Sequence, residues 1–174
     1  MGVVVSNYLK NQYYKDFYRG NDSARSTVER ESLTSGTLIK ADSTAMKRAV
    51  SQLTSLYKNR SEEGLDGRKV YGAVLAFGDT FNNLLDSASG STNHRAKSLA
   101  KSIKSLSSQQ KSDLEAIGIK VKGSGKISID KEALQGASAR KVEKVFGENS
   151  DFTKALEKYA RSLGSASKTI DLQA

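Results

Sequence analysis

The sequence predicts a mainly α-helical protein with a small β-hairpin (α+β), built as an antiparallel helical bundle joined to a compact hairpin-helix module. Apolar residues recur at helical spacing through several long segments, and a short stretch near residue 120 changes to strict alternation. Ser, Asp and Gly stand where the periodic segments begin and end, as helix caps do. With 174 residues, the chain is long enough for one modest hydrophobic core.

Changes in period and composition divide the chain into three parts. Residues 1–36 form an N-terminal helix and connector, and residues 37–108 form the antiparallel bundle. Residues 109–174 form the hairpin-helix module with a C-terminal helix. A hairpin of this size is not stable alone and must lay its apolar face on helices. We therefore expect the second and third parts to pack as one compact unit.

The N-terminal segment 7–18 carries tyrosines and other apolar residues in a roughly helical stripe that ends before Gly20. It predicts a helix packed on the body of the protein. A stacking platform for nucleic-acid bases is the less favoured alternative for these tyrosines. Residues 21–36 are polar and predict a connector.

Three bundle helices follow from apolar spacing of i, i+3, i+4 and i+7. The first starts at Asp42 or Ser43 and reaches Tyr57, the second runs from about Asp66 to just before Gly90, and the third covers 92–105. Short links between them favour antiparallel neighbours.

Two glycines, Gly72 and Gly78, lie inside the second of these helices. An interior glycine costs a helix about 1 kcal/mol relative to alanine. Their presence predicts either close approach of another element or a bound ligand, and close approach is the favoured interpretation.

The third part begins with a short helix that Ser108 would cap and Gly118 would end. Residues 119–121 and 127–129 then alternate in polarity around a glycine-containing turn, which predicts a β-hairpin. Asp130 and Ser138 are candidate N-caps of two short helices. A last helix starts at residue 149 or 150, and the residues after position 164 are expected to form a frayed tail.

The residue inventory argues against an enzyme. The sequence has one histidine, His94, and no cysteine, which excludes a thiolate nucleophile, a disulfide and the usual zinc ligand sets. The segment 123–126 (GSGK) lacks the spacing of a phosphate loop and reads as the hairpin turn. Asp79 and Asp86, seven residues apart, share a helix face as many charged pairs do. We expect no cofactor and no metal.

Charge supplies the main alternative function. The net charge is +9, and residues 95–126 hold eight basic side chains against only Asp113 and Glu115. A solvated face is the simpler interpretation, but such a region can also bind a polyanion such as nucleic acid. The candidate polyanion-binding residues are Arg95, Lys97, Lys101, Lys104, Lys120, Lys122 and Lys126.

Four short motifs follow one another in the second half of the sequence. They are FGDTFNNLL (77–85), LEAIGI (114–119), GKISIDKEAL (125–134) and VEKVFG (142–147). In this order they resemble the C-terminal region of the flagellar hook-associated protein 2 (filament cap) family. The long terminal coiled-coil helices of that family have no counterpart here, so the resemblance extends to the fold of this region and not to assembly of a cap.

The resemblance implies a non-enzymatic structural or protein-interaction module in a bacterium. Its partners would be other protein subunits, such as those of a flagellum, or further copies of the chain. It would then act outside the cell with the flagellum, and otherwise in the cytoplasm. The apolar run at residues 3–5 is too short for a Sec signal or a membrane span, so we expect neither.

Overall fold

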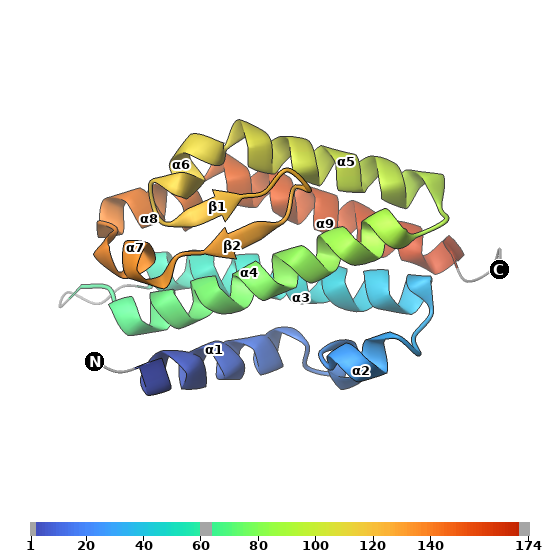
Figure 1. Cartoon of the computed structure of the whole chain (residues 1–174), viewed down its shortest axis with the longest axis horizontal. Coiled ribbons are helices and arrows are strands. Elements are labelled where there is room, and N and C mark those ends of the chain that lie inside the picture. The colour runs from blue at the N-terminus through green and yellow to red at the C-terminus, as the bar shows by residue number, and fades with distance from the viewer. Residues whose placement is uncertain (1–2, 60–63, 171–174) are drawn as a thin grey trace.

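A computed structural model describes residues 3–59 and 64–170 and shows four long helices packed around a common core (Figure 1). Successive long helices run antiparallel. The four helices are α3 (Ser35–Lys58), α4 (Gly67–Gly90), α5 (His94–Gln109) and α9 (Asp151–Ile170). The mainly α-helical class with a small hairpin is confirmed.

Helix α3 starts about two turns earlier than predicted. Its N-cap is Thr34, whose hydroxyl accepts a hydrogen bond from the Thr37 amide, so Asp42 and Ser43 do not begin the helix but lie buried within it. Asp42 resembled an N-cap in the sequence because a carboxylate is rare on the buried face of a helix.

Helix α5 is capped by Asn93, whose side chain accepts from the Ala96 amide at 3.0 Å. The helix continues past residue 105 to Gln109, so Ser108 lies inside it and does not cap the short helix α6 (Lys111–Glu115). The predicted caps Asp130 and Ser138 are confirmed, since each accepts a hydrogen bond from an amide three residues on.

An N-terminal layer of α1 (Val3–Phe17), η1 (Asp22–Ala24) and α2 (Thr27–Arg30) covers one side of the bundle (Figure 1). Helix α1 lies along α4, and a Cβ at Gly72 would meet the Cβ of Leu9 at 2.7 Å. Gly72 therefore permits the close approach that the sequence predicted. Residues 21–36 are more ordered than a connector, because they contain both short helices.

The hairpin pairs β1 (Ile119–Val121) with β2 (Ile127–Ile129) in antiparallel register, with Ile119 opposite Ile129. Its apolar face rests on α4, where a Cβ at Gly78 would meet the Ile129 Cδ1 at 2.7 Å. The chain then forms α7 (Lys131–Gly136) and α8 (Ala139–Phe146), which lie at one end of the bundle (Figure 1).

Helix α9 does not end at Gly164. It continues to Ile170 and buries Ala166 and Ile170, so the predicted tail is wrong up to that residue, and residues 171–174 lie outside the described part. The helix tolerates Gly164 because its far half packs along α3, where the position of a Cβ on Gly164 lies 3.6 Å from the Ser43 Cβ.

The core joins the bundle to the hairpin-helix module through a cluster of aromatic rings. Phe77 of α4 lies edge-on to Phe146 of α8 at 5.0 Å and to Phe152 of α9 at 6.2 Å between ring centroids. All three are almost fully buried. Edge-to-face packing adds to the free energy gained by burying these rings.

Candidate functional site

The predicted basic residues come from two elements that the fold brings together. Arg95, Lys97, Lys101 and Lys104 lie on α5, and the other three lie on the hairpin. The turn of the hairpin packs on α5, because a Cβ at Gly125 would lie 2.5 Å from the Lys104 Cγ. The structure therefore brings the helix and hairpin parts of this basic region, here called the basic face, together at Lys104 and the hairpin turn.

Two members of this face are neutralised. Lys126 Nζ lies 2.7 Å from Asp86 Oδ2, and Lys120 Nζ lies 3.5 Å from Asp130 Oδ2. The remaining five form no ion pair with the described residues: Arg95, Lys97, Lys101, Lys104 and Lys122. Fewer unpaired positive charges are therefore available to a polyanion than the seven basic residues of the sequence indicate.

A charged network lies buried between the N-terminal layer and the bundle. Asp42 is fully buried, and its two carboxylate oxygens accept hydrogen bonds from Nη1 and Nη2 of Arg30, each at 2.8 Å. The Tyr18 hydroxyl donates to Asp42 Oδ1 at 2.7 Å. The Asn83 amide donates to the hydroxyls of Tyr18 and Tyr14, at 3.0 and 2.8 Å. The network thereby links α1, α2, α3 and α4.

Its electrostatics favour fixed charges over proton transfer. Burial raises the pKa of the Tyr18 hydroxyl, and the charge of Asp42 raises it further. Burial opposes the charged form of Arg30, but the hydrogen bonds and charge of Asp42 outweigh it and raise the Arg30 pKa. Tyr18 stays a neutral donor and Arg30 stays a cation, as expected of a structural clamp.

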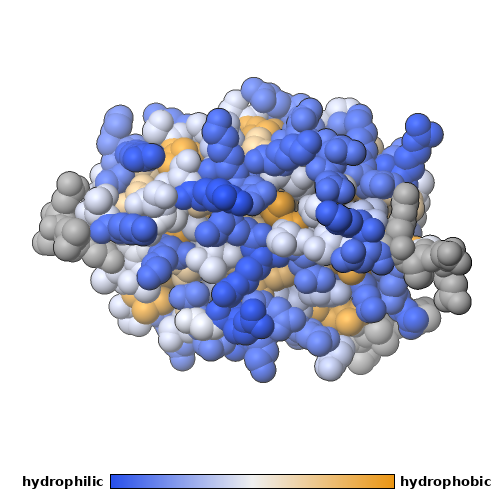
Figure 2. Space-filling view, turned by 180° about the vertical axis from the view of Figure 1, so that it is seen from behind, coloured by the Kyte–Doolittle hydropathy of each residue, from blue (hydrophilic) through white to orange (hydrophobic). Residues whose placement is uncertain are grey.

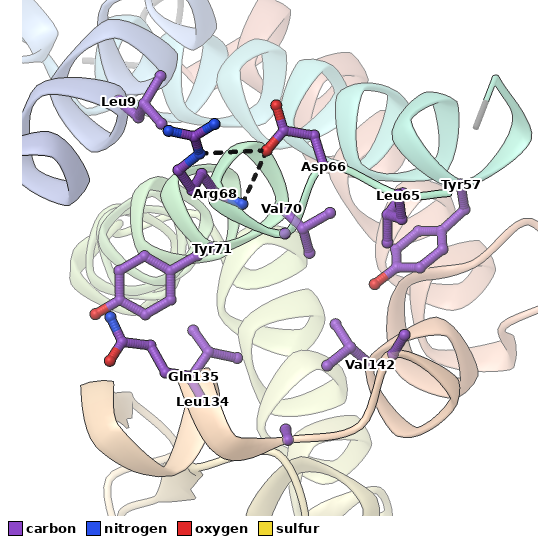
Figure 3. A pocket seen from close by; sticks show the side chains of 13 residues that line it. Leu9, Tyr57, Leu65, Asp66, Arg68, Val70, Tyr71, Leu134, Gln135 and Val142 are labelled. Carbon is purple, nitrogen blue, oxygen red and sulfur yellow. Dashed lines mark hydrogen bonds and ion pairs between the residues drawn. The ribbon is translucent and has the colours of Figure 1, made fainter. Parts of the chain in front are cut away.

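A pocket of about 620 Å³ opens at the end of the bundle where five segments meet (Figure 3). It lies between α1, the end of α3, the start of α4, α7 and α8. Most of its wall is apolar, and the apolar and aromatic lining residues are Leu9, Tyr57, Leu65, Val70, Tyr71, Leu134, Ala137, Ala139 and Val142. This size and lining are typical of small-molecule sites.

Tyr57 is the unusual residue of this pocket. Its side chain is 5% exposed, and its hydroxyl is shielded from solvent and finds no hydrogen-bond partner among the described residues. Figure 3 shows the ring extending from the end of α3 with the hydroxyl turned toward Val142. Burial, and then the charge of Glu143, raise the pKa of this hydroxyl, which therefore stays protonated.

The residues considered for catalysis lie apart from one another. His94 is exposed at the first position of α5, Asp79 pairs with Lys10, and Asp86 pairs with Lys126. Within residues 3–59 and 64–170, no three metal-ligating side chains gather into a possible ion site. No helix in the same ranges is long and apolar enough to cross a membrane.

Comparison with known proteins gives no further assignment: no family model, curated protein or solved structure matches this chain.

Sequence reasoning missed both the network and the pocket. One signal for the network was available: with Ile39 and Met46 on the buried stripe of α3, helical spacing also places Asp42 on that stripe. No comparable signal announced the pocket, because its walls come from segments that only the tertiary fold brings together.

Proposed function

We propose that this protein is a non-enzymatic structural or protein-interaction module that docks onto other protein subunits, in the manner of part of the bacterial flagellar filament cap. The observation that carries the proposal is the N-terminal layer. Tyr8 on α1 is 68% exposed and Val28 on α2 is 81% exposed, and these are the large apolar side chains that the described residues leave in solvent.

The layer is held rigidly enough to present them. The Asp42 network anchors it, and Arg48 of α3 donates to the carbonyls of Phe17 and Arg19 at 3.1 and 2.6 Å. An anchored surface loses little conformational entropy when a partner binds. Figure 2, which shows the opposite side from Figure 1, has small separate hydrophobic areas among hydrophilic ones.

A binding measurement tests this function. Val28→Asp and Tyr8→Asp place a charge at each exposed apolar position and should each weaken binding to purified flagellin or hook-junction subunits of the host by about tenfold or more. Ser98→Asp, on the exposed face of α5, is the matched control and should bind as the wild type does. Equal binding by all variants would contradict the proposed surface.

Genome context and sizing test the flagellar part separately. Flagellin, hook or flagellar-chaperone genes beside this gene would support it, and a non-motile host lacking all of them would rule it out. Light scattering on the purified chain would detect self-association through the same surface, which Val28→Asp should abolish.

The second candidate function is polyanion binding by the five basic side chains that form no ion pair with the described residues. Affinity for DNA or heparin must then fall steeply with added salt. Replacing Lys97 and Lys101 together by Ala should make the slope of log K against log salt shallower by about 0.9 per lost DNA phosphate contact. Replacing the ion-paired Lys120 and Lys126 should change it less. Binding insensitive to salt would exclude this candidate.

A further inference from the structure

The pocket at the end of the bundle has the character of a binding site that neither the interaction surface nor the basic face requires. We infer that it binds a small, uncharged and largely apolar molecule that offers a hydrogen-bond acceptor to the Tyr57 hydroxyl.

The size and lining of the pocket indicate that most of the ligand is apolar. The pocket of about 620 Å³ is open on one side and bounded by side chains from five segments, and that wall is mostly aliphatic or aromatic. Removing apolar surface from water contributes about 25 cal/mol per Å², so an apolar body gains most from entering. A strongly hydrated molecule would lose its water shell without replacement.

The charged residues at the pocket favour a neutral ligand. Asp66 Oδ1 accepts hydrogen bonds from the amides of Arg68 and Lys69, at 3.1 and 3.4 Å, so it occupies the N-terminus of α4 where an anion would otherwise bind. The Arg68 guanidinium lies 3.9 Å from the same carboxylate. Lys69 Nζ lies 4.0 Å from the other oxygen of this carboxylate. Because Asp66 and Arg68 are already paired with each other, neither offers an unpaired charge to an ionic ligand.

Tyr57 indicates that the ligand also carries a hydrogen-bond acceptor. A buried hydroxyl without a partner is uncommon in folded proteins, since its desolvation goes uncompensated. The raised pKa keeps it as an O–H donor, and the hydroxyl is turned toward Val142, a residue of the pocket wall (Figure 3). Because the hydroxyl is closed to solvent in this structure, the pocket wall beside it must shift for a carbonyl or ether oxygen of the ligand to accept this hydrogen bond.

Prodan is a suitable probe, because it is an uncharged naphthyl ketone whose emission moves to the blue in apolar surroundings and to the red when its carbonyl accepts a hydrogen bond. The 174-residue chain should bind one equivalent with saturable, blue-shifted emission. Tyr57→Phe should weaken binding about threefold to tenfold, as expected for one hydrogen bond. The emission of bound prodan should also move further to the blue.

Two controls place the site. Ala137→Trp fills the pocket and should abolish binding, whereas Ala116→Trp, an exposed position outside the lining, should not. Tyr159→Phe removes a hydroxyl outside the pocket and should leave affinity and emission unchanged. If circular dichroism shows that Ala137→Trp does not fold, Ala139→Trp at the exposed rim replaces it.

A second measurement depends on stability alone. If the hydroxyl is unsatisfied without ligand, Tyr57→Phe should leave the thermal midpoint unchanged or raise it, and prodan should raise the wild-type midpoint more than that of the variant. The absence of saturable binding, or binding that persists when the pocket is filled, would overturn the site. A Tyr57→Phe complex with wild-type affinity and emission would overturn the role of Tyr57.

Discussion

The N-terminal layer and the β-hairpin both pack on α4, yet they are attached by different interactions. The layer is anchored by a buried charged network of Asp42, Arg30 and Tyr18. The hairpin is anchored by apolar burial of Ile119 and Ile127, with short polar contacts only at its edges. Removing one partner of a buried ion pair is strongly destabilising, because the other charge stays buried and unpaired. Trimming an apolar contact costs free energy roughly in proportion to the apolar area that is no longer buried.

Asn82 and Asn83, neighbours on α4, show the contrast most directly. The Asn82 side chain donates to the Ile127 carbonyl at 2.8 Å and accepts from the Ile127 amide at 2.9 Å, so it completes the free edge of β2. Asn83 donates instead to the two tyrosine hydroxyls of the N-terminal layer. One turn of α4 therefore serves both attachments.

The largest expected effect is on the charged network. Asp42→Ala leaves the half-buried Arg30 without its carboxylate and should lower the free energy of unfolding by about 3–5 kcal/mol in urea denaturation. The double variant Asp42→Leu with Arg30→Met removes both charges and should recover most of that loss. A single variant as stable as the wild type would show that the network contributes little.

A smaller loss of stability is expected when alanine replaces either glycine at which another element approaches α4, and the two losses should differ. Gly72→Ala places a methyl group 2.7 Å from the Leu9 Cβ and near the backbone of α1, and should cost about 1–3 kcal/mol. Gly78→Ala meets only the Cδ1 end of the Ile129 side chain, which can rotate away, so we expect a smaller loss. Thermal unfolding of both variants checks this order, and the reverse order would contradict it.

On the hairpin side, Asn82→Ala leaves the amide and carbonyl of Ile127 without their partner and should cost about 1–3 kcal/mol. Hydrogen exchange should become faster in the hairpin and remain unchanged in α1. Asn82→Asp is the informative control, since it keeps the acceptor for the amide and loses the donor to the carbonyl. Faster exchange in α1 as well would mean that the two attachments are coupled.

Alkaline pH should weaken the attachment of the N-terminal layer. The folded pKa of Tyr18 is raised by burial, so its contribution to stability is fully present below the unfolded pKa near 10 and is lost as pH rises. At pH 11 the loss from Tyr18 is about 1.4 kcal/mol. Tyrosinate absorbance should rise together with faster hydrogen exchange in α1. Tyr18→Phe gives the control, because it should lose this part of the pH dependence.

The smallest expected loss of stability is the one caused by acid through Asp130, which follows the hairpin. The Ala133 amide, and then the charge of Lys120, lower the pKa of Asp130 at the start of α7. Its contribution is therefore present above the unfolded pKa near 4 and is lost as pH falls through the lower folded value. Stability measured between pH 5 and 2 should fall less in Asp130→Asn. An identical pH profile for the variant would contradict this role.

Local patterns in the sequence predicted the long helices, the hairpin and the caps of α7 and α8. Apolar spacing identified the second bundle helix, and Asp130, Ser138 and Gly118 marked element boundaries correctly, because these signals act within a few residues. The close approaches at Gly72 and Gly78 were also predictable, since an interior glycine in a buried helix calls for such a reason.

Only the tertiary structure decided what lies between the elements. Asp42 resembled a helix cap until Arg30 and Tyr18 were brought to it, and Gly164 resembled a helix end until packing on α3 carried α9 onward. Lys120 and Lys126 counted as free charges until the fold placed Asp130 and Asp86 beside them. The pocket around Tyr57 belongs to no single segment. Partners far apart in sequence are set by packing, which a short window of residues does not contain.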